Sequence, residues 1–204
     1  AFDLAFKYRN PAIILADGVI GQMMEKVVLP EQRPRLTNEE VMARCPWATF
    51  GKLKHRGPNI VTSLELDPAE MEKRNIHLQQ KYAEIEEKEV RYEEIHCDDA
   101  EYLIVAFGSC ARIAQKAMEE ARAEGIKVGL LRPITLWPFP SKAIAERSRQ
   151  VKGILTVELN AGQMVEDVRL AVECKVPVEY FGRLGGIVPD PDEVVTALKE
   201  KIIK

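Results

Sequence analysis

The sequence predicts an α/β fold in which a parallel sheet carries helices on both faces. From residue 102 onward, short apolar runs typical of buried strands alternate with segments whose apolar residues recur at helical spacing. Strand, helix, strand, helix and strand in this order require parallel pairing with right-handed crossovers. The expected strands lie at 102–107, 127–131, 153–159 and 177–181, and the expected helices lie around 113–121, at 142–149, at 162–172 and after 190.

Capping residues mark the ends of several expected helices. Gly125 follows the first helix of the sheet domain, at a position where glycine commonly ends a helix. Asp190 is placed to cap the last helix, while Asp67 and Pro68 begin a long helix that extends to about Glu89. The apolar stripe of the long helix is narrow. It therefore lies across its own protein or contacts another subunit, and the sequence leaves both alternatives open.

The chain before residue 100 has a different character. Residues 1–9 resemble the last turns of a helix, and because this spacing is established at Ala1 we expect a longer protein upstream. Pro11–Ala16 is expected to be a buried strand, and the Asp17-Gly18 pair after it is either a ligand loop or a plain turn. Arg91–His96 is expected to be a short edge strand. The predicted organisation is the tail of a second α/β domain at 1–29, a linker at 30–99 with the long helix at about 68–89, and the sheet domain at 100–204.

Composition excludes several classes of function. The net charge is −3 with acids and bases interleaved, so no nucleic-acid or membrane partner is expected. The longest apolar runs are far shorter than the roughly 20 residues that span a bilayer. The four cysteines are scattered without a C-x-x-C pair, so we expect free thiols, no metal site and a cytoplasmic protein.

Candidate site residues follow the expected strands. They are Gly108, Ser109, Arg132, Asn160 and Arg183. The carboxyl ends of parallel strands meet at one edge of the sheet, where α/β proteins bind ligands. The sequence therefore predicts that these five residues bind a cofactor.

The chemistry at these positions leaves alternatives open. The first helical turn at Ser109 is expected either to hold a phosphate or only to have Ser109 as its cap. Arg132 is expected to clamp a carboxylate or phosphate, or to pair with an acid across a domain boundary. Cys110 also lies in this turn, where a helix dipole favours a thiolate, but no histidine is near in sequence. No catalytic residue is predicted in this chain.

Several motifs resemble those of one enzyme family. The run Lys7–Gly18 resembles the end of the thiamine-pyrimidine domain of 2-oxoacid:ferredoxin oxidoreductase alpha subunits. The runs Tyr102–Ser109, Gly129–Pro140 and Val157–Met164 look like the following domain of the same subunits, which is similar to the C-terminal domain of transketolases. The branch that acts on 2-oxoisovalerate (2-ketoisovalerate) or 2-oxoglutarate is the most similar.

This resemblance implies oxidative decarboxylation of a 2-oxoacid to an acyl-CoA with reduction of ferredoxin. It implies thiamine diphosphate and Mg²⁺ mainly on a partner beta subunit, an iron–sulfur cluster on another subunit, a further gamma subunit, and coenzyme A as co-substrate. The catalytic residues are expected upstream of Ala1, so the fragment alone is expected to be inactive. The alternatives are a non-catalytic scaffold domain of a multi-subunit complex, and the beta subunit of a lipoamide-linked 2-oxoacid dehydrogenase.

Overall fold

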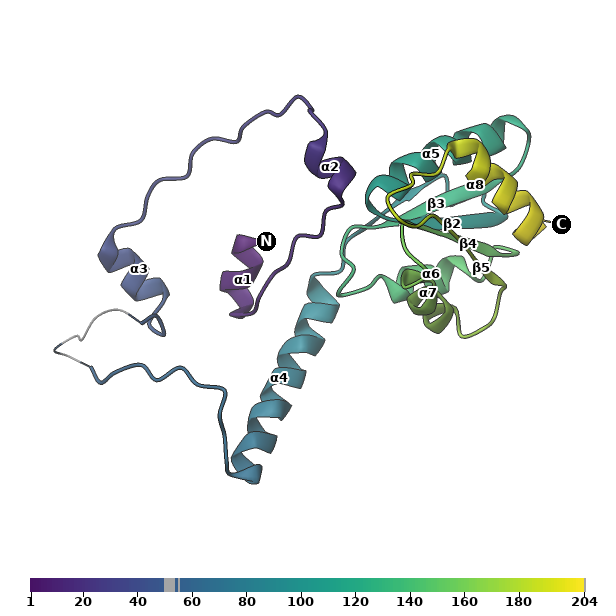
Figure 1. Ribbon diagram of the computed structural model, residues 1–204. Coiled ribbons are helices and arrows are strands. Elements are labelled where there is room, and N and C mark those ends of the chain that lie inside the picture. The colour runs from purple at the N-terminus through teal and green to yellow at the C-terminus, as the bar shows by residue number, and fades with distance from the viewer. Residues whose placement is uncertain (50–53, 55, 204) are drawn as a thin grey trace. The chain divides into compact units, whose positions relative to one another are not determined.

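The computed structural model describes residues 1–49, 54 and 56–203 (Figure 1). The chain divides into two compact units. One consists of Ala1–Met23 with Gln79–Lys204, and the other of Met24–Leu78. Within the described residues, no helix is both long enough and apolar enough to cross a membrane.

The sheet of the first unit has five strands in the order β1-β3-β2-β4-β5. Neighbouring strands are parallel except at β1, which pairs with β3 in the antiparallel direction and forms one edge. This arrangement confirms the predicted parallel sheet and the predicted edge strand. The strands are β1 (Tyr92–Ile95), β2 (Tyr102–Ala106), β3 (Val128–Pro133), β4 (Ile154–Glu158) and β5 (Val178–Gly182).

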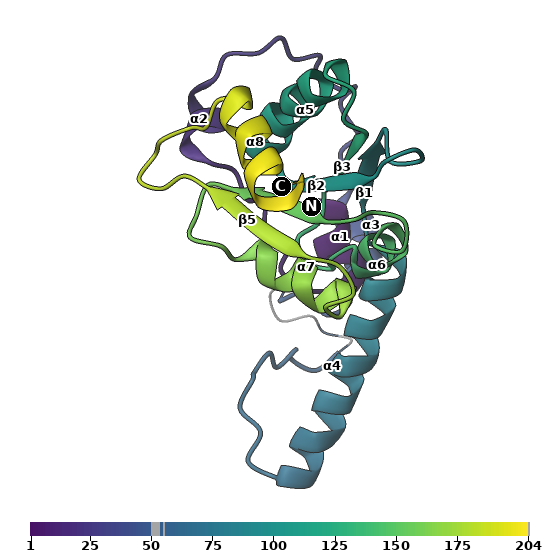
Figure 2. The same ribbon diagram turned by 90° about the vertical axis from the view of Figure 1, so that its right-hand side faces the viewer.

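Helices cover both faces of this sheet (Figure 2). Helices α5 (Gly108–Ala123) and α8 (Pro191–Leu198) pack on one face, and α6 (Ser141–Arg147) and α7 (Met164–Val172) pack on the other. The alternation of side chains along a strand explains the two cores. In β2, Ile104 and Ala106 belong to the α5/α8 core, whereas Leu103 and Val105 belong to the α6/α7 core. A π-helical turn, η1 (Lys199–Ile203), continues α8.

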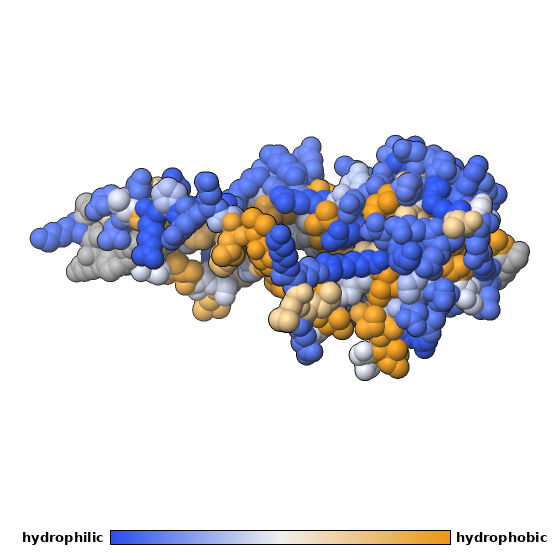
Figure 3. Space-filling view, turned by 90° about the horizontal axis from the view of Figure 1, so that it is seen from above, coloured by the Kyte–Doolittle hydropathy of each residue, from blue (hydrophilic) through white to orange (hydrophobic). Residues whose placement is uncertain are grey.

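The buried strand expected at Pro11–Ala16 is wrong. The segment is extended between α1 (Phe2–Tyr8) and α2 (Gly18–Gln22), and Ile13, Ile14 and Leu15 are 80%, 78% and 71% exposed. A parallel strand needs a neighbour for its backbone hydrogen bonds, and none of the strands in the described chain pairs with this segment. Exposed apolar residues also interrupt the hydrophilic surface in Figure 3.

Helix α1 is fixed by a buried carboxylate after the end of α4 (Pro68–Lys88). Glu89 is only 8% exposed and accepts hydrogen bonds from Lys7 Nζ at 2.6 Å and from the Tyr8 hydroxyl at 2.7 Å. These two hydrogen bonds hold the pKa of Glu89 below its usual range. A third contact joins Lys81 Nζ of α4 to Asn10 Oδ1, two residues after the end of α1, at 3.3 Å. The N-terminal helix is thus part of the first unit.

The long helix forms as predicted. Asp67 caps α4 by accepting a hydrogen bond from the Ala69 N–H at 2.8 Å, and the helix ends one residue before Glu89. Tyr82, in its last two turns, meets Trp137 edge to face with ring centroids 5.7 Å apart. This end of α4 therefore lies on its own protein, and a contact with another subunit stays a prediction. The remaining described helix is α3 (Asn38–Arg44) in the second unit.

Candidate functional site

A hollow of about 220 Å³ lies where β2 and β4 end. It brings together three of the predicted site residues, namely Gly108, Ser109 and Asn160. The N-terminal segment supplies other lining residues, among them Asp17, which the sequence offered as part of a ligand loop without predicting that it meets Ser109. The full lining is Leu15, Ala16, Asp17, Ile20, Phe107, Gly108, Ser109, Cys110, Glu158, Leu159 and Asn160.

Asp17 joins the N-terminal segment to α5 at this hollow. The Ser109 hydroxyl donates to Asp17 Oδ2 at 2.7 Å, and the Ile20 N–H donates to Asp17 Oδ1 at 2.8 Å. These hydrogen bonds, the one from Ile20 foremost, lower the pKa of Asp17. Ser109 does not cap its own helix, because the N-cap position of α5 is Phe107 and carries no side-chain cap. The prediction that Ser109 serves only as a helix cap is therefore wrong.

Glu158, the last residue of β4, is fully buried and occupies the amino end of α7. Its Oε2 accepts from the N–H groups of Gln163 at 3.1 Å and Met164 at 2.8 Å, and its Oε1 accepts from the Val165 N–H at 3.0 Å. A carboxylate satisfies unpaired backbone donors of a first helical turn and complements the helix dipole. Glu158 therefore shapes the loop between β4 and α7.

Asn160 is held in this loop by two contacts. Its Oδ1 accepts from the Gly162 N–H at 2.7 Å, and its backbone carbonyl accepts from the Tyr180 hydroxyl. Sequence reasoning missed Tyr180. The only local signal is the pair of glycines, Gly162 and Gly182, whose missing side chains leave room for the tyrosine ring.

The two predicted arginines do not line the hollow. Arg132 extends from β3 to Glu93 of the neighbouring β1, with 3.1 Å between Nη1 and Oε2. Arg183 follows β5 and pairs with Glu193 of α8. Both guanidinium groups are close to half exposed, at 46% and 40% of the side-chain surface. Each arginine therefore pairs with an acid of the same compact unit, whereas the alternative offered for Arg132 was an acid across a domain boundary.

The Cys110 thiol is not activated. Burial, with Glu158 and Asp17 nearby, raises its pKa to about 11. The same cause raises the pKa of Cys97 to about 11. The helix dipole is outweighed at Cys110, so the residue behaves as a small core side chain.

We predict that iodoacetamide at pH 8 labels Cys174 in the folded protein and leaves Cys45, Cys97 and Cys110 unmodified. Cys174 is exposed and the other three are buried. At this pH only about one in a thousand thiols with a pKa near 11 is ionised. Peptide mass spectrometry measures the modification, with the protein unfolded in urea as the control in which all four react. Labelling of Cys110 as fast as Cys174 contradicts the burial of Cys110.

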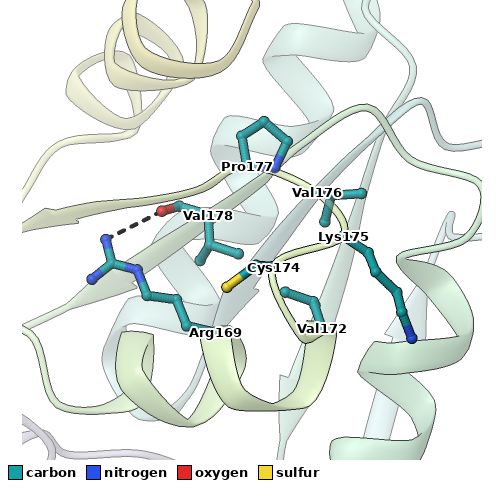
Figure 4. A pocket seen from close by; sticks show the side chains of 7 residues that line it. All are labelled: Arg169, Val172, Cys174, Lys175, Val176, Pro177 and Val178. Carbon is teal, nitrogen blue, oxygen red and sulfur yellow. Dashed lines mark hydrogen bonds between the residues drawn. The ribbon is translucent and has the colours of Figure 1, made fainter.

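A second hollow, of about 350 Å³, lies at the opposite edge of the sheet, where β5 begins (Figure 4). Arg169 Nη2 donates to the Val178 carbonyl at 3.3 Å across it. Its remaining walls are mostly aliphatic, with Lys175 paired to Glu173. This hollow gathers no group of acid, base and nucleophile, so the candidate site is the one at Ser109.

The polar groups of the candidate site hold parts of the chain in place. Its two carboxylates, Asp17 and Glu158, already accept hydrogen bonds from the protein. Within the described residues, no group of three or more histidine, cysteine and acidic side chains is arranged to hold a metal ion. The hollow joins a distant segment of the chain to the carboxyl edge of the sheet.

Comparisons with known proteins agree with this fold. Residues 100–194 match the family model "Pyruvate:ferredoxin oxidoreductase core domain II". Ketoisovalerate oxidoreductase subunit VorB of Methanothermobacter thermautotrophicus is 47% identical over 98% of this chain and 55% of the relative. 2-Oxoglutarate synthase subunit KorA of Archaeoglobus fulgidus is 31% identical over 93% of this chain and 53% of the relative.

A solved structure gives the same result. The 2-oxoglutarate:ferredoxin oxidoreductase of Magnetococcus marinus, determined with 2-oxoglutarate, coenzyme A and succinyl-CoA bound, matches with a TM-score of 0.60 and 25% identity. The match covers 71% of this chain and 25% of that chain. The chain spans about half the length of the subunits VorB and KorA. Over nearly its whole length the chain is therefore similar to subunits of 2-oxoacid oxidoreductases, and residues 100–194 match the core domain II of pyruvate:ferredoxin oxidoreductase.

Proposed function

We propose that this chain is part of the alpha subunit of an enzyme that oxidatively decarboxylates a 2-oxoacid to an acyl-CoA and reduces ferredoxin. The observation that carries the proposal is the 47% identity with a ketoisovalerate oxidoreductase subunit over nearly the whole chain. Identity with 2-oxoglutarate synthase subunits is lower, at 28–31%. We therefore propose 2-oxoisovalerate as the substrate to be tested first.

The described residues that line the hollow do not fit the diphosphate group of thiamine diphosphate. The two helix ends that border the hollow, those of α5 and α7, already face the carboxylates of Asp17 and Glu158. A diphosphate is repelled by carboxylates at these positions. We propose that thiamine diphosphate and Mg²⁺ are bound by a partner beta subunit.

The cysteines also do not fit an iron–sulfur cluster. All four are free, and the three buried ones lie at Cys45, Cys97 and Cys110 without a shared ligand geometry among the described residues. We propose that the cluster belongs to another subunit, that a gamma subunit completes the complex, and that ferredoxin is the electron acceptor.

The composition of the purified complex tests this assignment of the cofactors to partner subunits. The intact subunit, expressed with its natural neighbours, is expected to copurify with a thiamine-diphosphate subunit and with a cluster-bearing subunit. Thiamine diphosphate and iron are measured in the complex and in the intact subunit alone. We expect both in the complex and neither in the single subunit. Stoichiometric iron or thiamine diphosphate in the single subunit contradicts the proposal.

The cofactor contact predicted at Arg132 and Arg183 is proposed for coenzyme A, whose phosphates suit half-exposed guanidinium groups. We expect Arg132→Ala and Arg183→Ala each to raise the coenzyme A KM by roughly 10- to 100-fold without changing kcat, since a hydrogen bond to a charged group contributes about 1.5–3 kcal/mol. Arg169→Ala is the matched control, because this arginine lies at the opposite edge of the sheet.

Steady-state kinetics of the assembled complexes gives the result. A normal coenzyme A KM in both variants contradicts the proposal that these arginines contact coenzyme A. A lower yield of assembled complex, in which the remaining complex has a normal coenzyme A KM, supports a second function, that of a scaffold domain. The comparisons favour the oxidoreductase function over this alternative.

A further inference from the structure

The contact between Asp17 and Ser109 joins residues 92 positions apart in the chain. The two carboxylate oxygens of Asp17 accept hydrogen bonds from different parts of the chain. Oδ1 accepts from the Ile20 N–H and so begins α2, while Oδ2 accepts from the Ser109 hydroxyl at the first turn of α5. The same side chain therefore fixes the local fold of its own segment and attaches that segment to the sheet domain.

The amino end of α5 has features that favour binding of the Asp17 carboxylate. Gly108 begins α5 with a φ of +57°, a left-handed conformation that suits glycine. Ser109 is 9% exposed and uses its hydroxyl for Asp17 rather than for its own helix. The amino end of a helix carries partial positive charge, which favours a negative side chain. Asp17 thus lies where an external anion binds in many α/β proteins.

The N-terminal segment is held at two separated places. Near its start, Lys7 and Tyr8 bond to Glu89. Near its end, Asp17 bonds to Ser109, and the residues between these attachments include the exposed Ile13 and Ile14. An extended segment without sheet partners gains little order of its own. Its far end therefore depends on the contact with Ser109.

We infer that Asp17 and Ser109 form a latch by which the α/β domain positions the segment Asp17–Gln22. Ser109 is in this account a positioning residue. The effect on turnover rests on the proposed function, because it requires the active complex. The effect on the segment itself does not.

Hydrogen exchange of the backbone amides in α2 tests the latch directly. Ser109→Ala is expected to raise the exchange rates of these amides about tenfold, as loss of a hydrogen bond to a charged group implies. Ser109→Thr, which keeps the hydroxyl, is expected to exchange like the wild type. Thr37→Ala is the matched control, since Thr37 caps only its own helix, α3. It is expected to raise exchange in α3 and not in α2.

A double-mutant cycle separates the latch from a general loss of stability. Asp17→Asn keeps an oxygen that caps α2, because asparagine caps helices as well as aspartate does. Adding Ser109→Ala to Asp17→Asn is expected to raise exchange in α2 by less than twofold further, because the contact is already weakened. Exchange in α2 at the wild-type rate in Ser109→Ala, or rate increases that multiply in the double variant, overturns the inference.

Activity supplies the functional measurement. In the assembled complex, Ser109→Ala is expected to lower kcat about threefold or more and leave the coenzyme A KM within twofold, with recovery in Ser109→Thr. Normal kcat in Ser109→Ala overturns the positioning role. A wild-type complex that reduces no viologen with any 2-oxoacid contradicts the proposed function, and the exchange result then still decides whether the latch exists.

Discussion

Replacing Glu158 by Ala is expected to destabilise the protein by about 3–5 kcal/mol, because it leaves buried donors without an acceptor. Three backbone N–H groups, those of Gln163, Met164 and Val165, bond to this carboxylate, and Glu158 itself is fully buried. The loss also opens a space at the end of β4. The expected fall in Tm is about 10 °C.

Two further variants give this prediction its control. Glu166→Ala removes an exposed glutamate from the same first turn of α7, and is expected to change Tm by less than about 2 °C. Glu158→Gln keeps one acceptor oxygen and is expected to fall between the two. A Glu158→Ala protein that unfolds within 2 °C of Glu166→Ala shows that the cap contributes nothing.

Replacing Gly182 by Ala is expected to cost about 1–3 kcal/mol, the range for inserting a methyl group into a packed site. A Cβ at this position lies 2.6 Å from Tyr180 Cζ and 2.8 Å from the Glu158 carbonyl oxygen. The tyrosine has to leave, and its hydroxyl then loses the Asn160 carbonyl. The strand pairing between Glu158 and Gly182 has to adjust as well.

Thermal unfolding measures the cost, with Gly57→Ala as the control because a Cβ there meets nothing within 4 Å. The double variant Tyr180→Ala with Gly182→Ala separates the two causes. If the tyrosine is the obstacle, Gly182→Ala costs less in the Tyr180→Ala background than in the wild type. Equal costs in the two backgrounds place the clash at the backbone of Glu158 alone.

Local signals in the sequence were sufficient for the α/β domain. Apolar runs such as Leu103–Ala106 identify strands because both faces of a parallel strand are buried. The helix ends could also be predicted from capping residues, because a cap contacts residues close to it in the sequence. Asp67 bonds within its own first turn, and the Asp190 N–H donates to Glu193 three residues later, so the relevant contacts lie within a few residues of each other.

Contacts between distant residues were not predictable in this way. An apolar run such as Pro11–Ala16 has the composition of a strand, but strand formation depends on a neighbour that the run itself does not encode. The partner of Ser109 is equally remote, since Asp17 and Ser109 come together only when the N-terminal segment meets α5. The ion pairs of Arg132 with Glu93 and of Arg183 with Glu193 were also not predicted, because neither partner lies in the local sequence pattern around its arginine.

Glu158 represents an intermediate case. An acid at the end of a strand, followed four residues later by Gly162 and then by a helix, is a readable pattern for a carboxylate that caps the next helix. The sequence analysis placed the nearby Asn160 at a ligand edge, but it did not give the direction of the Glu158 side chain. The structure turns it inward to α7, which makes it a support of the loop rather than a group for binding.

The measurement that tests the central claim most directly is 2-oxoacid- and coenzyme A-dependent reduction of methyl viologen by the intact subunit purified with its natural partners. We predict reduction that requires both substrates and is faster with 2-oxoisovalerate than with 2-oxoglutarate. A complex that contains thiamine diphosphate and clusters and yet reduces no viologen with any 2-oxoacid contradicts the proposal that this chain serves a 2-oxoacid:ferredoxin oxidoreductase.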